Sequence, residues 1–145
     1  MNRNRRRAVK RSAFTLVELL VVIVIIGLLA SLVAPKFFGK LDDAKLKTAK
    51  AQVEMLSTSL DAFRLDVGRY PTTAEGLKVL WEKTDNNIKG FNGPYLPKPV
   101  KEDPWGNEYQ YHDESKNGNP YELFSYGPDG VKGGSGTNKD ISVWE

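Results

Sequence analysis

Apolar residues form an unbroken block near the start of the chain and a spaced pattern after it. Residues 14–34 read FTLVELLVVIVIIGLLASLVA, 21 positions with one charge, Glu18. As an α-helix rising about 1.5 Å per residue, this block is roughly 30 Å long, which matches the hydrocarbon thickness of a bilayer. The pattern predicts a membrane-spanning helix. A cleavable secretory signal is less favoured, because the block is longer than the apolar part of such signals.

Beyond Pro35 the apolar residues recur every three or four positions, in a row that we call the seam. The seam consists of Leu46, Ala49, Val53, Leu56, Leu60, Phe63 and Val67. This spacing predicts a helix from about Phe14 to Val67, ended by Gly68. The seam is long enough for a short coiled coil, but packing on the chain's own C-terminal part is favoured. Because proline removes a helical hydrogen bond, we expect a kink or local melting near Pro35.

Residues 69–145 read as turns and short strands. Thr72-x-x-Glu75 is a capping box for a short helix ending near Lys83. Residues 86–101 are expected to be loop. Residues 108–112 and 121–125 alternate as half-buried strands do, with a turn at 116–120, and 141–144 is a candidate third strand. The predicted fold is therefore α+β: a long N-terminal helix packed on a small antiparallel β-sheet. The aromatic side chains are interpreted as packing residues: Trp81, Trp105, Tyr109, Tyr111, Phe124 and Trp144.

Composition narrows the possible functions. The chain has no cysteine and one histidine, His112, so thiol chemistry and a histidine metal cluster are excluded. We interpret His112 as a surface residue of a strand, and we do not expect an enzyme, because no convergent set of acids, bases and nucleophiles is present. Six of the 21 basic residues lie in the first twelve positions, which leaves 15 basic against 18 acidic residues, a net −3. The folded part is therefore not expected to bind nucleic acid, and the basic leader predicts a cytoplasmic N-terminus.

Glu18 is the one charged residue inside the apolar block. It could reach water at the membrane surface, or it could meet a positive charge supplied by another chain. If the chain were cut just before Phe14, a new α-amino group would arise four positions from Glu18. In a packed assembly that amine could then pair with the carboxylate of a neighbouring subunit.

Residues 125–141 form a segment with five glycines and isolated acidic residues, which we call the glycine loop. Glycines allow carbonyl oxygens to turn inward, and Asp129 and Asp140 add carboxylate oxygens. Such hard oxygen donors are what Ca²⁺ prefers. Composition alone favours an ordinary flexible surface loop over a calcium site, and both interpretations stay open at this point.

Residues 12–22, SAFTLVELLVV, resemble the class III signal of type IV pilins and pseudopilins. The resemblance implies that a prepilin peptidase cuts between Ala13 and Phe14 and methylates the new amine. The leader, residues 1–13, would be removed, the 14–34 helix retained, and residues 35–145 would form a periplasmic domain anchored to the inner membrane. The family usually has glycine where this chain has Ala13; alanine is also a small residue, so cleavage is still expected.

Three further segments resemble the major pseudopilins of type II secretion systems, often called GspG. They are residues 70–77, residues 103–111, and residues 125–136 followed by 140–144. The resemblance implies a type IV pilin-like fold and a Ca²⁺ site in the glycine loop. The implied ligands are the side chains of Asp129 and Asp140, the carbonyls of Tyr126 and Val131, and Asn138 or Lys139, where relatives may offer another acid.

The same resemblance implies assembly rather than catalysis. The chain would be the major subunit of a periplasmic pseudopilus that drives export of folded proteins across the outer membrane. Its expected partners are copies of itself, minor pseudopilins, the inner-membrane assembly platform, the prepilin peptidase and, before assembly, membrane lipid. Glu18 is expected to pair with the Phe14 amine of a neighbour. The alternative is another type IV pilin-like filament subunit, for adhesion or DNA uptake.

Overall fold

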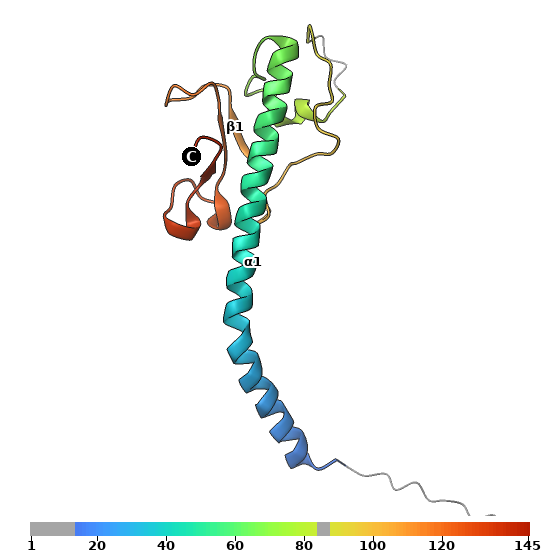
Figure 1. The fold of residues 1–145 in the computed structure, drawn as a ribbon, viewed down its shortest axis with the longest axis vertical. Coiled ribbons are helices and arrows are strands. Elements are labelled where there is room, and N and C mark those ends of the chain that lie inside the picture. Colours follow the sequence, from blue (N-terminus) through green and yellow to red (C-terminus); the bar gives the residue numbers. More distant parts are fainter. Residues whose placement is uncertain (1–13, 84–87) are drawn as a thin grey trace, which may run out of the picture. The chain divides into compact units, whose positions relative to one another are not determined.

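The computed structural model describes residues 14–83 and 88–145, apart from the side chains of residues 34–36. The chain divides into two compact units, the first ending at Lys40 and the second beginning at Leu41. Helix α1, Leu16–Val67, contributes to both (Figure 1). The predicted long helix is therefore confirmed, with its start two residues after Phe14. Gly68 ends it as predicted: its φ is 86°, and its N–H donates to the Arg64 carbonyl at 2.8 Å.

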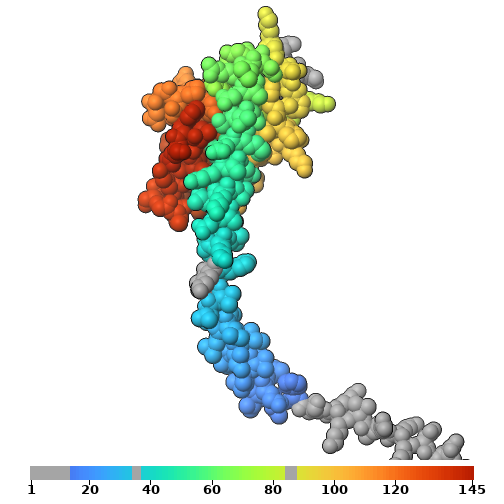
Figure 2. Space-filling view, viewed as in Figure 1, coloured from blue at the N-terminus to red at the C-terminus, as the bar shows by residue number. Residues whose placement is uncertain are grey.

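The first part of α1 is apolar and uncovered. From Leu16 to Val33 its large apolar side chains are about half exposed or more, and Figure 2 shows them in blue on the surface. Among the described residues, α1 is the one helix long and apolar enough to cross a membrane. The helix continues without interruption through Pro35, so the expected local melting is wrong. One missing N–H removes a single bond of the ladder, and the bonds before and after it still form. The expected kink stays a prediction.

In the second unit, the seam of α1 is the centre of the hydrophobic core. Ala49, Val53, Leu56, Leu60 and Phe63 are at most 1% exposed. Leu46 and Val67, at the two ends of the seam, pack against this core and are partly buried. Because the chain itself covers the seam, the favoured intrachain packing is confirmed and the coiled-coil alternative is wrong.

A three-stranded antiparallel sheet packs on the seam. Its strands are β1 (Gln110–His112), β2 (Glu122–Ser125) and β3 (Ile141–Ser142), in the order β1-β2-β3. Tyr111 lies opposite Leu123, and both face the core. The predicted α+β fold and the candidate third strand are thus confirmed. His112 is exposed on β1, as predicted.

The strands are shorter than predicted at three ends. Glu108 makes only an isolated bridge with Glu102, so β1 begins at Gln110. Strand β2 begins after Tyr121, and β3 ends before Val143. Beyond β3 the chain turns, and the Trp144 Nε1–H donates to the Tyr121 carbonyl at 2.9 Å. Trp144 therefore joins the sheet through its side chain instead of its backbone.

The capping box at Thr72 forms, and the short helix expected after it is present as a 3₁₀ helix. The Thr72 N–H donates to Glu75 Oε2 at 2.7 Å, and the Glu75 N–H donates to Thr72 Oγ1 at 3.2 Å. Gly76 then adopts φ 59° and ψ −170°, which is not helical. The chain therefore first makes a turn, and the short helix is the 3₁₀ helix η1 (Leu77–Leu80), which ends short of the predicted end near Lys83.

The segment after η1 covers a different side of α1 from the sheet (Figure 1). The rings of Phe91 and Tyr95 pack edge-on against Phe63, at 6.1 and 5.7 Å between centroids. The N–H groups of Tyr95 and Leu96 both donate to the Leu80 carbonyl, at 2.7 and 2.8 Å. Residues 88–101 contain no helix or strand, as predicted, and residues 86–87 of the predicted loop lie outside the described residues.

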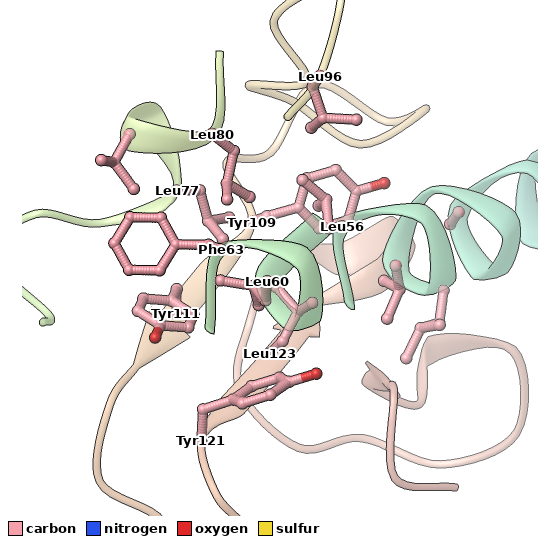
Figure 3. Close-up of a cluster of buried hydrophobic side chains, with 14 residues drawn as sticks. Leu56, Leu60, Phe63, Leu77, Leu80, Leu96, Tyr109, Tyr111, Tyr121 and Leu123 are labelled. Carbon is pink, nitrogen blue, oxygen red and sulfur yellow. The ribbon is translucent and has the colours of Figure 1, made fainter. Parts of the chain in front are cut away.

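Four of the six aromatic residues interpreted as packing residues serve the core, namely Trp81, Trp105, Tyr109 and Tyr111. Phe124 packs instead on the ring of Tyr126, and the exposed Trp144 packs on the ring of Tyr121. Figure 3 shows Tyr109 and Tyr111 beside Leu56, Leu60 and Phe63 of α1. The Tyr109 hydroxyl donates to Gln52 at 2.6 Å and the Tyr111 hydroxyl to the Pro71 carbonyl at 2.7 Å, so these buried polar groups are satisfied. Trp81 and Trp105 pack against the same core from its edge.

Candidate functional site

The first turn of α1 is closed by a reciprocal pair of hydrogen bonds between Thr15 and Glu18. The Thr15 N–H and hydroxyl donate to Glu18 Oε2 at 2.8 and 2.9 Å, and the Glu18 N–H donates to Thr15 Oγ1 at 3.2 Å. This is a capping box, with Thr15 as the N-cap and Glu18 three residues into the helix. Phe14, the first described residue, has a side chain that is 77% exposed, and Ala13 lies outside the described residues.

The charge of Glu18 has no partner in the described part of the chain. The ion pairs found there are Arg69–Glu75 and Lys139–Glu145. All described hydrogen bonds to the Glu18 side chain go to Oε2, which leaves Oε1 open to a further donor. The cap therefore fixes the direction of the carboxylate without neutralising it. The sequence analysis singled out Glu18 but missed the capping role of Thr15, although the Thr-x-x-Glu spacing was the signal for it.

The glycine loop connects β2 to β3 and contains two short 3₁₀ helices, η2 (Gly127–Asp129) and η3 (Gly136–Asn138). These two helices lie against each other. At Gly134, which has φ +88°, a Cβ atom would lie 2.2 Å from the Asn138 carbonyl oxygen, so only glycine fits there. The loop is thus folded back on itself, with most of its residues exposed.

Asp140 closes the second half of the loop. Its Oδ2 accepts the Gly133 N–H at 2.9 Å, and its own N–H donates to the Gly133 carbonyl at 3.3 Å. Its Oδ1 is buried and accepts no hydrogen bond from any described residue. A buried acceptor without a donor costs about 1–3 kcal/mol. A cation at Oδ1 would remove that cost.

The other predicted ligands are divided between the two halves of the loop. Tyr126 is the N-cap of η2 and packs its ring on Phe124, 5.4 Å away. Asp129 is exposed, and its Oδ1 accepts the Val131 N–H at 3.1 Å; the Val131 side chain points to solvent. Asn138 ends η3. The structure thus brings Tyr126, Asp129 and Val131 together in one half, with Asn138 and Asp140 in the other.

The donor set of this loop suits a hard cation. In the part of the chain that the structure describes, no three His, Cys, Asp or Glu side chains gather closely enough to hold a metal ion. A metal here would therefore depend on backbone carbonyls beside the two aspartates. Carbonyl, amide and carboxylate oxygens are the donors that Ca²⁺ takes, so the residues present fit that ion.

Comparison with known families shows which class of protein has both the capped Glu18 at the start of α1 and the glycine loop. The family described as "Type II secretion system (T2SS), protein G" matches residues 36–144, and the "Prokaryotic N-terminal methylation motif" matches residues 9–34. The chain belongs to the type II secretion system protein G family. This is a family of structural secretion-system subunits, and the match favours it over a pilin-like subunit for adhesion or DNA uptake.

Individual relatives agree with this family. The chain is 41% identical over 138 residues to the type II secretion system core protein G of Pseudomonas aeruginosa, covering 94% of this chain and 96% of the relative. It is 40% identical over 137 residues to the core protein G of Vibrio cholerae, covering 93% and 92%. The major pseudopilin from the type 2 secretion system of enterohaemorrhagic Escherichia coli aligns with a TM-score of 0.57 at 34% identity, over 74% of this chain and 92% of that one.

The family accounts for the fold as well as the first turn of α1. The long helix with a small antiparallel sheet is the type IV pilin-like fold of the structural relative. The match to the methylation motif covers Ala13, Phe14 and Glu18. As a protein G family member, the chain is a subunit of the type II secretion pseudopilus. One apolar helix in such a subunit fits an inner-membrane anchor.

Proposed function

We propose that the prepilin peptidase cuts this chain between Ala13 and Phe14 and methylates the new Phe14 amine. The retained helix then anchors the subunit in the inner membrane with residues 35–145 in the periplasm. From there the subunits polymerise as the major component of a periplasmic pseudopilus that drives export of folded proteins across the outer membrane. The observation that carries this proposal is the exposed apolar part of α1, which starts at a capped carboxylate without a described counter-charge.

Assembly would cover the exposed apolar side chains of α1 and supply a positive charge to Glu18. Lipid covers the apolar side chains before assembly, and the helices of other subunits cover them afterwards. The capping box directs Glu18 without neutralising it, so the Phe14 amine of a neighbouring subunit supplies the missing positive charge. A charge pair removed from water must be geometrically precise to offset its desolvation, and this requirement sets the register between subunits. Minor pseudopilins and the inner-membrane assembly platform act on the same polymer.

Calcium has a structural role in this proposal. The ion would be held by Asp129 and Asp140, by the carbonyls of Tyr126 and Val131, and by Asn138. When bound, it supplies a compact positive charge that cross-links the two halves of the glycine loop. The buried, unpartnered Oδ1 of Asp140 supports this assignment. An ion that binds only the folded chain stabilises it by mass action.

The intact mass and N-terminal sequence of the protein from membranes of its own host test the processing step. We expect a chain that begins with N-methylated Phe14. A chain that keeps Met1, or one cut near Ala34, would contradict the proposal, because no amine would then arise beside Glu18.

Thermal unfolding of the full chain in detergent tests the calcium role. With Ca²⁺ about 100-fold above its dissociation constant, we expect a melting temperature about 5–10 °C higher than in chelator. Asp140→Asn is expected to lose this difference, whereas the control Asp113→Asn, on a turn outside the loop, keeps it. Equal melting temperatures of the unmodified chain with Ca²⁺ and with chelator would contradict a structural calcium site.

A further inference from the structure

Asp103 is a buried carboxylate on the turn before β1, only 5% exposed. Its Oδ1 accepts the N–H groups of Trp105 and Asn107 at 3.0 and 2.9 Å, and its Oδ2 accepts the hydroxyl of Ser125. In residues 14–83 and 88–145, no cationic side chain forms an ion pair with it. Three donors from two separate segments therefore converge on this carboxylate, and hydrogen bonds to a charged acceptor are the strong ones.

Two residues held by Asp103 both reach Gly127, the first residue of η2. The fully buried Ser125 hydroxyl accepts the Gly127 N–H at 3.0 Å. The Asn107 side-chain amide donates to the Gly127 carbonyl at 2.9 Å. Both backbone polar groups of Gly127 are thus bound by residues that Asp103 holds, Ser125 through its hydroxyl and Asn107 through its backbone N–H.

Gly127 is also the point where the start of the glycine loop meets its end. Its φ is +73°, and a Cβ atom there would lie 3.2 Å from the Lys139 carbonyl oxygen. Lys139 immediately precedes Asp140. Asn107 also touches the far end of η2, because a Cβ atom on Gly130 would lie 2.9 Å from Asn107 Oδ1. The turn at residues 103–107 therefore binds η2 at Gly127 and lies close to its other end, while η2 lies against η3, just before Asp140.

We propose that Asp103 is the positioning residue of the glycine loop. Through Ser125 and Asn107 it fixes Gly127, so that the donors on η2 and the donor Asp140 stay within reach of one Ca²⁺. The inference rests on the proposed calcium role, and it makes the affinity for Ca²⁺ depend on a carboxylate that is not itself a ligand.

The test measures Ca²⁺ binding and loop opening in the full chain in detergent micelles. Radioactive Ca²⁺ gives the dissociation constant at a temperature where circular dichroism shows each variant folded. Hydrogen–deuterium exchange of residues 126–134 in chelator reports the position of the loop without metal. The variants are Asp103→Asn and Ser125→Ala.

Each variant has a matched control elsewhere in the second unit. Ser59→Ala removes a buried hydroxyl that donates to the Met55 carbonyl at 2.9 Å within α1. Asp113→Asn alters a carboxylate outside the glycine loop that accepts a hydrogen bond from the Thr73 hydroxyl. We expect both test variants to bind Ca²⁺ at least tenfold more weakly and to exchange faster over 126–134. We expect both controls to stay within twofold of the unmodified chain. The double variant, Asp103→Asn with Ser125→Ala, is expected to bind Ca²⁺ no more weakly than the single variant of lower affinity. Both changes interrupt the same series of hydrogen bonds.

Three results decide the proposal. If the test variants melt at lower temperature but bind Ca²⁺ as the unmodified chain does, Asp103 merely stabilises its turn and the inference is overturned. If the unmodified chain binds no Ca²⁺, the calcium role fails, and exchange alone decides whether Asp103 positions the loop: unchanged exchange overturns it and faster exchange supports it. If Ser125→Ala does not fold, Asn107→Ala, at a half-buried residue, replaces it with the same expected directions.

Discussion

Two turns in this chain are closed by a threonine and a glutamate three residues later, at Thr15–Glu18 and at Thr72–Glu75. The threonine N–H donates to the carboxylate at 2.8 Å in the first and 2.7 Å in the second, and the return bond is 3.2 Å in both. Among the described residues, only the second has a counter-charge: Arg69 donates to both carboxylate oxygens of Glu75, at 2.7 and 2.8 Å. The charge of Glu75 is thus paired within the subunit, whereas Glu18 is oriented by Thr15 and has no ion-pair partner among the described residues.

The two parts of α1 differ in the same way. The seam between Ala49 and Phe63 is covered by the chain itself, while the apolar side chains from Leu16 to Val33 are exposed. A subunit whose seam is covered by its own chain and whose first helical part exposes apolar side chains is suited to polymerisation through that exposed part. Changes to each part therefore have different expected consequences.

The largest expected effect separates the two glutamates. Glu18→Gln keeps a side chain that can close the capping box but removes the charge, so we expect at least a tenfold loss of pseudopilus polymer. Glu75→Gln is the matched control and is expected to assemble normally, because its charge is paired within the subunit. Immunoblots of polymer released by shearing give the yield, with membrane level and N-terminal processing measured alongside. A normal yield of polymer from Glu18→Gln would contradict a role of the Glu18 charge in assembly.

A smaller effect separates buried from exposed leucines on α1. Leu60 is 0% exposed and Leu65 is 86% exposed. Leu60→Ala is expected to lower the free energy of unfolding by about 2–5 kcal/mol, because it removes core contacts and leaves a cavity. Leu65→Ala is expected to change it by less than about 0.5 kcal/mol. Chemical denaturation of the full chain in detergent measures both. Equal losses would contradict the packing of the seam on the chain's own sheet.

The smallest effect concerns acid. Hydrogen bonds from Arg69 lower the pKa of Glu75 from 4.5 to about 2. Since the folded state lowers this pKa, the stabilisation is complete above about pH 4.5 and is lost as the pH falls towards 2. Exposed ion pairs contribute about 0.2–1 kcal/mol. We expect Arg69→Met to reduce the dependence of the free energy of unfolding on pH in this window. Lys78→Met removes a charge without a described ion-pair partner and is expected to leave that dependence unchanged. Identical slopes in both variants would show that the Arg69 pair is not the cause.

Features set by local spacing could be predicted from the sequence. The seam, the end of α1 at Gly68 and the three strands each follow from periodicity or from a turn residue. The short helix after Thr72 is shorter than predicted, because Gly76, with φ 59° and ψ −170°, is not helical and only the 3₁₀ helix η1 follows it. Local melting at Pro35 failed because the helix on either side is strong enough to continue through one missing bond.

The candidate site shows where such reasoning stops. Its predicted ligands lie in one folded loop, and that loop is visible in the sequence as a run of glycines. The bonds that fix the loop join Asp103 to Ser125 and Asn107 to Gly127, about twenty positions apart. No spacing rule connects two residues across that distance, so this network is found only in three dimensions.

The central claim is that Glu18 pairs with the Phe14 amine of another subunit. Solid-state NMR on filaments assembled from an equal mixture of subunits tests it most directly, one half carrying ¹⁵N at the Phe14 amine and the other ¹³C at the Glu18 carboxyl. Any transfer between these labels must cross from one subunit to another. Ion-pair contact, with the nitrogen within about 4 Å of a carboxylate oxygen, predicts strong dephasing of the carboxyl signal. Intact mixed filaments without that dephasing would contradict the pairing.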